Sequence, residues 1–194
     1  MENTSEYIIK KIAPIFNKQG FIGTSLSDLT KVTNLTKGAL YCNFANKEEL
    51  ALKSFQLNIK KTITPLYSIL RREKNSINKL LALTNYYRTY YELAKERGGC
   101  PVLNVGIDAK HNNIALYDEA KKESNKLVLG LSMIIQNGID NKEIIKSIDA
   151  IIYAMNIYAM IEGAIFMSFM QENSDFLNNI LNHIDLEIIN KMKV

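Results

Sequence analysis

Polar side chains able to bind nucleic acid are concentrated in one short segment, residues 36–44. Hydroxyl, ammonium and amide groups are the ones that proteins use to contact DNA phosphates and base edges. Two small residues, Gly38 and Ala39, lie among them and would let the backbone approach a duplex closely. The polar residues of the segment are Thr36, Lys37, Tyr41, Cys42 and Asn43. This pattern favours nucleic-acid binding over catalysis.

Residues for catalysis or metal binding are scarce. His111 and His183 stand apart, with no Cys or carboxylate at the spacing of metal ligands. The chain has neither a phosphate-binding glycine loop nor a nucleophile elbow. Glu162 lies inside an apolar stretch, where a carboxylate needs either a structural partner or a ligand. We therefore expect no enzyme activity, no metal and no cofactor.

Composition limits the fold class. The 194 residues are 47% hydrophobic, so the chain can bury a core, and its 9 Gly and 3 Pro are too few turn formers for a many-stranded fold. An all-α protein is predicted. Two cysteines cannot make a secreted disulfide framework, and residues 1–6 lack a basic segment followed by an apolar one, so we expect a cytoplasmic location.

Charge is distributed unevenly along the chain. The net charge is +4, and residues 1–61 contain nine Lys against five acidic residues, whereas residues 62–194 contain fifteen of each sign. Two interpretations stay open, a chance surplus or a basic head that meets phosphates.

Capping signals predict short helices near the N-terminus. Apolar residues three and four positions apart predict a first helix from Ile8 to about Gly20, with a kink at Pro14. Ser25 and Asp28 then form a capping box that opens a second helix through about residue 33.

The next signals predict a turn and two more helices. Asn34 tolerates the left-handed backbone of a tight turn, and Thr36 is the N-cap of a third helix through about residue 44. Asn46 and Glu49 repeat the cap signature before a long fourth helix. The second and third helices together have the size and spacing of a helix-turn-helix.

Longer helices are predicted over the rest of the chain. Pro65 should bend the fourth helix, and a fifth is expected from Ser76 to Arg97. Gly98-Gly99-Cys100-Pro101 is a stop signal, with Cys100 at the N-cap position of the next helix. Further helices are expected over about 101–110, 113–137, 141–171 and 175–192.

The N-terminal third resembles a known family. Residues 12–21 read IAPIFNKQGF, residues 24–29 TSLSDL and residues 35–50 LTKGALYCNFANKEEL. Over about residues 8–55 this is similar to the DNA-binding head of the TetR/AcrR family of bacterial transcriptional regulators. Asn34 replaces the more usual Gly at the turn, and Cys42 and Asn43 replace a common aromatic residue and His. Residues 99–104, GCPVLN, resemble a segment found in one branch of the family.

The resemblance implies an all-α fold, with a helix-turn-helix DNA-binding domain over 1–47 and a ligand-binding and dimerisation domain over 48–194. It implies a homodimer, most often a repressor, that leaves double-stranded operator DNA when a small-molecule effector binds, and that has no membrane partner. A helical binding protein without a regulatory role is the alternative. Positions that match DNA-contacting residues are Ser25, Ser27, Lys31, Thr36, Lys37, Gly38, Tyr41, Cys42, Asn43 and Lys47. Tyr41 and Lys47 match phosphate contacts, although Tyr41 could instead pack inside the head.

A ligand cavity is predicted between the middle helices. Aromatic and Met side chains with a few polar groups are the usual lining of a small-molecule pocket. The residues expected there, each of which could also be plain core, are Tyr67, Tyr86, Tyr90, Asn104, Tyr117, Met133, Tyr153, Asn156, Met160 and Glu162.

The stretch from Ile144 to Met170 is apolar around nearly its whole circumference. Its part from Ala150 to Met170 is long enough to cross a bilayer, but Asn156 and Glu162 favour a buried interface helix over a membrane span. The residues expected in a two-fold four-helix interface are Ile151, Met155, Ile165, Phe169, Ile180 and Ile184.

Cys100 allows a second hypothesis about sensing. A thiol at a helix N-cap faces the positive end of the helix dipole, and Lys95 and Arg97 lie nearby in sequence. Cys100 is either a small cap at a helix corner or a thiol that senses oxidants and electrophiles.

Overall fold

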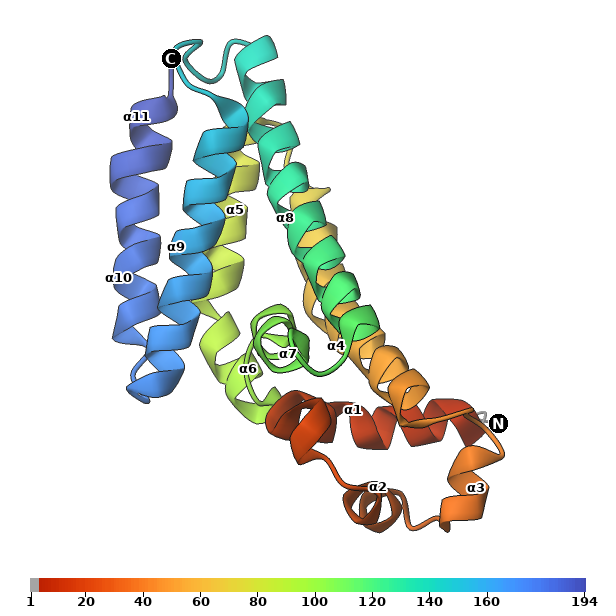
Figure 1. Cartoon of the computed structure of the whole chain (residues 1–194). Coiled ribbons are helices and arrows are strands. Elements are labelled where there is room, and N and C mark those ends of the chain that lie inside the picture. Colours follow the sequence, from red (N-terminus) through yellow and green to blue (C-terminus); the bar gives the residue numbers. More distant parts are fainter. Residues whose placement is uncertain (1–3) are drawn as a thin grey trace. The chain divides into compact units, whose positions relative to one another are not determined.

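The computed structural model describes residues 4–194, and the start of the predicted 1–47 domain lies outside them. Regular structure in the described part is helical (Figure 1), apart from one antiparallel bridge between Ile144 and Lys193. The all-α prediction is therefore confirmed. The chain forms two compact units, one comprising residues up to Ile63 with Arg97–Lys122 and the other Thr64–Glu96 with Glu123–Val194. These units reflect packing and do not test the predicted functional boundary at residue 47.

The first four helices follow the capping signals closely. They are α1 (Thr4–Gly23), α2 (Leu26–Thr33), α3 (Lys37–Tyr41) and α4 (Lys47–Leu70). The Glu49 amide donates to Asn46 Oδ1 at 2.9 Å, which confirms the cap of α4. The third helix ends at Tyr41, earlier than expected, because the backbone turns at residues 42 and 43.

The break in α1 lies at Gly20, as expected, whereas Pro14 keeps helical backbone angles. Gly20 has φ 74° and ψ 176°, a conformation that favours glycine. A Cβ there would also lie 2.7 Å from the Asp108 carboxylate. That carboxylate accepts a hydrogen bond from the Phe21 amide at 2.5 Å, so the break fixes α1 to α7 (Pro101–Ala109).

The first unit is assembled around α1. Its apolar face packs on α7 and α2. The Asn58 side chain on α4 donates to the Ala13 carbonyl at 2.8 Å and adds a buried polar link. Buried apolar residues of this unit include Ile8, Ile12, Ala13, Phe16, Leu29, Leu40, Leu50 and Phe55.

The glycine corner between α6 (Tyr90–Arg97) and α7 is held by two asparagines. Asn17 donates to the Gly99 carbonyl at 3.0 Å, and Asn104 donates to the Gly98 carbonyl at 2.6 Å. Asn104 also donates to the Asn17 carbonyl at 2.9 Å. Gly98 and Gly99 have φ of 86° and 102°, which explains the need for glycine at both positions. The corner is thus fastened to α1.

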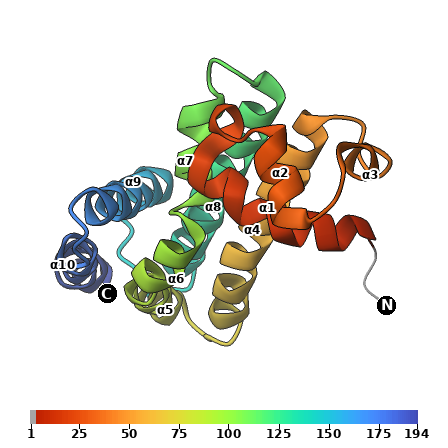
Figure 2. The same ribbon diagram turned by 90° about the horizontal axis from the view of Figure 1, so that it is seen from below.

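The second unit contains α5 (Ser76–Arg88), α9 (Ala150–Met170), α10 (Asp175–His183), a π-helix η1 (Ile184–Ile189) and α11 (Asn190–Met192). Helix α10 packs against both α9 and α5. Figures 1 and 2 both show α9 and α10 running side by side. Arg88 on α5 forms an ion pair with Asp185 of η1 at 2.6 Å, which adds a polar tie to this packing.

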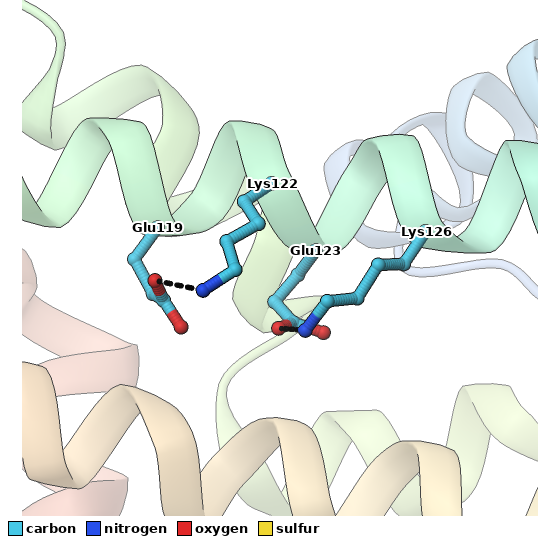
Figure 3. Close-up of polar contacts among 4 residues, drawn as sticks. All are labelled: Glu119, Lys122, Glu123 and Lys126. Atoms are coloured by element: carbon cyan, nitrogen blue, oxygen red, sulfur yellow. Dashed lines mark hydrogen bonds and ion pairs between the residues drawn. The ribbon is translucent and has the colours of Figure 1, made fainter.

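Helix α8 (Ile114–Asp140) runs through both compact units. Two ion pairs join neighbouring turns of α8, Glu119 with Lys122 at 3.4 Å and Glu123 with Lys126 at 2.5 Å (Figure 3). Both lysines are exposed, whereas both glutamates are half-buried. Ion pairs that include a solvent-exposed side chain contribute little stability, roughly 0–1 kcal/mol each.

Two helix predictions were wrong. The expected helix over 76–97 is interrupted at Thr89, where the amide and the hydroxyl both donate to the Tyr86 carbonyl. The expected helix over 141–171 begins only at Ala150. Residues 141–149 form a loop because the Ile145 amide donates to the Met192 carbonyl at 2.9 Å, and Asp149 caps α9.

Helix α9 has one buried face and one exposed face, although both faces are largely apolar. One face is buried and includes Ala154, Ile157, Ile161 and Ile165. The opposite face is exposed, and we call it the α9 strip: Ile152, Met155, Ala159, Gly163, Phe166 and Met170. Among the described residues α9 is also the helix long and apolar enough to cross a bilayer, with 33% of its most apolar stretch buried.

Candidate DNA-binding surface and body cleft

The turn between α2 and α3 has the geometry of a helix-turn-helix. Ser25 and Asp28 form the predicted capping box, with the Asp28 amide 3.1 Å from Ser25 Oγ and the Ser25 amide 2.8 Å from Asp28 Oδ2. Ser25 Oγ also donates to Asp28 Oδ2 at 2.6 Å, and this hydrogen bond, together with the one from the Ser25 amide, holds the pKa of the Asp28 carboxyl below its usual value. Asn34 has φ 54° and ψ 30°, so it supplies the left-handed turn usually made by glycine.

Helix α3 is anchored on one side and exposed on the other. Thr36 caps it by accepting from the Ala39 amide at 3.2 Å, and Leu40 is fully buried. The exposed side brings most of the predicted DNA contacts to one short segment. Exposed predicted contacts on α2, α3 and their flanks are Ser25, Ser27, Lys31, Thr36, Lys37, Gly38 and Cys42.

Asn43 is tied into the head rather than extended into solvent. Its amide nitrogen donates to the Ala39 carbonyl at 3.0 Å, and its oxygen accepts from Ser5 Oγ at 3.0 Å. Both ends of the side chain therefore hold α3 to α1. Sequence reasoning gave Asn43 a place near base edges and did not foresee this positioning contact.

Tyr41 and Lys47 are half-buried. Lys47 Nζ lies 4.5 Å from the centre of the Phe21 ring, a cation–π geometry. Desolvation lowers the pKa of Lys47, while Asp108 and Glu48 act in the opposite direction. The contact with the Phe21 ring therefore positions the Lys47 side chain at the start of α4.

A cleft of about 290 Å³ lies among α4, α5 and α8 within the second unit, and we call it the body cleft. Gly130 on α8 has open space where a Cβ would be, so the cleft reaches the α8 backbone. Two of the predicted ligand residues, Tyr67 and Met133, line it. The full lining is Leu66, Tyr67, Leu70, Arg71, Lys79, Leu83, Leu127, Gly130, Leu131, Met133, Ile134 and Asn137.

The other predicted ligand residues lie elsewhere. Tyr86 and Tyr90 are buried in an aromatic cluster with Tyr87, with ring centres 5.5–6.2 Å apart. Asn104 is used at the glycine corner. Half-buried or exposed outside this lining are Tyr117, Tyr153, Asn156, Met160 and Glu162.

Sequence reasoning placed Met133 in the cleft but missed the rest of its α8 wall. It also missed two cations that line the cleft, Arg71 and Lys79. A signal was present: apolar residues at 127, 131 and 134, together with Gly130, recur at helical spacing. That spacing alone, however, does not distinguish a cleft wall from packed core.

The predicted dimer residues separate by exposure. Ile151 and Met155 are exposed, and Phe169 and Ile180 are half-buried. Ile165 and Ile184 are 1% and 0% exposed, so within one subunit both are core residues. Of the predicted residues, Met155 belongs to the α9 strip.

The two cysteines are free and differ in exposure. Cys42 is exposed on the flank of α3, and Cys100 is 6% exposed. Cys100 is the N-cap residue of α7, as predicted, but its thiol makes no cap hydrogen bond. Cys100 is therefore largely shielded from solvent, and its role as a sensor of oxidants and electrophiles stays a prediction.

Comparison with known proteins matches both parts of the chain. Residues 8–53 match the family of bacterial regulatory proteins, tetR family, and residues 76–184 match the tetracyclin repressor-like C-terminal domain. A TetR-family regulator from Cytophaga hutchinsonii is 33% identical, covers 98% of this chain and 95% of its own, and has a TM-score of 0.90. One from Chloroflexus aurantiacus is 29% identical over 98% and 96%, with a TM-score of 0.93. The chain belongs to the TetR family.

More distant relatives carry functional names. The transcriptional repressor NemR of Escherichia coli is 22% identical over 94% of this chain and 92% of its own length. The repressor DhaR of Mycobacterium sp. is 21% identical over 91% and 87%. Both relatives are named as helix-turn-helix transcriptional repressors, and each match covers more than nine-tenths of this chain.

Proposed function

We propose that the protein is a homodimeric transcriptional repressor, rather than an enzyme, that acts on operator DNA in the cytoplasm and is released by a small molecule. The observation that carries this proposal is the capped α2–α3 pair, which exposes Thr36, Lys37, Gly38 and Cys42 at the surface of the head. Relatives that are named as transcriptional repressors support repression, rather than activation, of the regulated genes.

DNA recognition rests on α3 entering the major groove. Lys37 and Cys42 would meet base edges, whereas Lys31, Tyr41 and Lys47 would meet phosphates. Two heads must then lie about 34–36 Å apart to occupy successive grooves. Asn43 supports this geometry indirectly by holding α3 to α1.

Dimerisation covers the α9 strip. Its six residues recur every three or four positions along α9, so a second copy can pack against the whole length of the helix. Glycine and alanine at positions 163 and 159 would permit close approach. The same strip on both copies makes the contact isologous, as two-fold symmetry requires.

Release by a ligand needs two states with different ligand affinities. Helix α4 links the two sites by chain continuity, since Lys47 begins it and Leu66, Tyr67 and Leu70 line the body cleft near its end. A ligand that fits the cleft better in one position of α4 would favour that position and change the spacing of the heads.

The test is a gel shift on DNA from upstream of the protein's own gene, with and without the small-molecule fraction of a cell extract. The fraction is expected to release the wild-type protein from DNA but not Gly130→Leu, whose isobutyl group would project into the body cleft and obstruct it. Gly106→Leu is the matched control, because Gly106 also has open space around a Cβ but lies in α7. Release of Gly130→Leu to the same extent as wild type would contradict the assignment of the cleft.

A further inference from the structure

Two cations line the body cleft without an acidic partner. Arg71 directly follows α4, and Lys79 lies in the first turn of α5. Across residues 4–194, neither side chain forms an ion pair or a hydrogen bond. The lining also contains no Asp or Glu. The cleft therefore presents positive charge that the protein itself leaves unpaired.

The polar groups of the cleft gather at one end. A short turn joins α4 to α5, which brings Arg71 and Lys79 to the same end of these helices. The C-terminal end of α8 lies there too, because a Cβ on Gly138 would be 2.8 Å from Ser76 Cβ. Asn137, in the last turn of α8, adds an amide to this end.

A carboxylate beside this polar end, that of Glu143, is already engaged in a hydrogen bond. Glu143, in the loop after α8, accepts a hydrogen bond from the Ser76 amide at 2.6 Å, at the start of α5. It satisfies a backbone donor at the helix N-terminus and is absent from the cleft lining. An anion entering from solvent would therefore meet the two cations with this acid already engaged.

The remaining walls are apolar. Leu66 on α4, Leu83 on α5 and Leu127 on α8 lie at least one helical turn from the polar end. Leu131 and Ile134 extend the α8 wall, and Gly130 leaves room beside it. The volume of about 290 Å³ lies near the lower limit, about 300 Å³, of pockets that hold small organic ligands.

We infer that the ligand of the body cleft is a small organic monoanion, a carboxylate with an apolar body. Its carboxylate would meet the Arg71 guanidinium, whose fork matches two carboxylate oxygens, and the Lys79 ammonium. Its apolar body would lie along the leucine walls of α4, α5 and α8. This inference rests on the proposed function, in which the cleft is the effector site.

The test compares three probes of equal chain length by isothermal titration calorimetry on the full-length protein: octanoate, 1-octanol and octylamine. Octanoate is expected to bind at least about tenfold more tightly than the other two, because charge-assisted hydrogen bonds are available only to the carboxylate. Gly130→Leu should abolish binding of octanoate, which shows that the cleft is the site.

Paired variants separate local recognition from overall charge. Arg71→Gln with Lys79→Gln should lose about tenfold or more in octanoate affinity and leave any 1-octanol binding unchanged. Arg72→Gln with Lys74→Gln removes the same charge from the neighbouring turn, outside the lining, and should bind octanoate as wild type does. Circular dichroism confirms that each variant is folded.

Absence of octanoate binding, equal affinities for octanoate and 1-octanol, or equal losses in both paired variants would overturn the inference. Release of DNA is measured in a separate gel shift. The preference of the cleft for anions and its role as the effector site can therefore be contradicted independently. Selective octanoate binding that does not release DNA would contradict the effector role of the cleft while supporting its preference for anions.

Discussion

At the scale of single residues, the helix caps of the head could be predicted from local sequence. An N-cap residue and the residue three positions later bond to each other, so their spacing alone identifies them. The sequence thus predicted the caps Ser25, Thr36 and Asn46. Asn43 could not be foreseen in the same way, since its partner Ser5 lies 38 residues away. Residues whose partners are distant in sequence are the ones that local reasoning misplaces.

Lys37→Ala should weaken operator binding without changing thermal stability, because Lys37 is exposed and forms no ion pair within the described residues. Because the substitution also removes one positive charge from the DNA interface, the slope of log affinity against log salt should fall by up to about 0.9. Fluorescence anisotropy at several salt concentrations measures both. Lys74→Ala, in the loop before α5, serves as control, and unchanged affinity of Lys37→Ala at every salt concentration would contradict the role of α3.

The capping box predicts a dependence of stability on pH. The pKa of Asp28 is held below its ordinary value of 3.8, so its contribution is present above that pH and is lost as pH falls through the lowered folded-state pKa. Wild type should therefore unfold less readily than Asp28→Asn at pH 5–7, and the difference should shrink below about pH 3. Urea unfolding at each pH measures this, and a difference that stays constant down to the lowest pH would contradict it.

At the scale of elements, helices were predicted well and their interruptions less well. The glycine corner was evident because Gly98, Gly99 and Pro101 are local signals. The loop over 141–149 was missed because its backbone pairs with Met192 and Val194, which only tertiary structure brings near. Most of the body-cleft lining was missed for the same reason, since the cleft exists only where three helices meet, and of the predicted residues Tyr67 and Met133 line it.

Gly98→Ala should destabilise the protein by about 1–3 kcal/mol, because Gly98 has φ 86° and an added Cβ would collide with Lys18. Gly106→Ala is the matched control inside α7. It has open space around the new Cβ and should gain about 0.5–1 kcal/mol from reduced unfolded-state entropy. Urea unfolding curves compare the two, and equal stabilities would show that the corner is not strained against side chains.

At the scale of the whole molecule, the proposed dimer requires that a second copy cover the α9 strip. The sequence predicted an interface on this helix from its uniform apolar composition. It could not separate the buried face from the exposed one, because both faces of α9 are apolar. Ile165 was therefore assigned to the interface although it packs inside the subunit.

Met155→Glu should convert the dimer to a monomer at micromolar concentration, because the charge would lie in the desolvated centre of the interface. Leu129→Glu is the control: Leu129 is equally exposed, at 57% against 55%, but lies on α8. Sedimentation velocity distinguishes the species. A monomeric wild type, or a Met155→Glu variant that remains dimeric, would contradict the assignment of the strip.

The most direct measurement of the central claim is selection of double-stranded DNA from a random library by the purified protein. The account predicts enrichment of an inverted repeat whose half-site centres lie about one helical turn, or a multiple of it, apart. It also predicts that Lys37→Ala enriches this sequence poorly. Failure of the folded wild-type protein to enrich any sequence would contradict the claim that this chain is an operator-binding regulator.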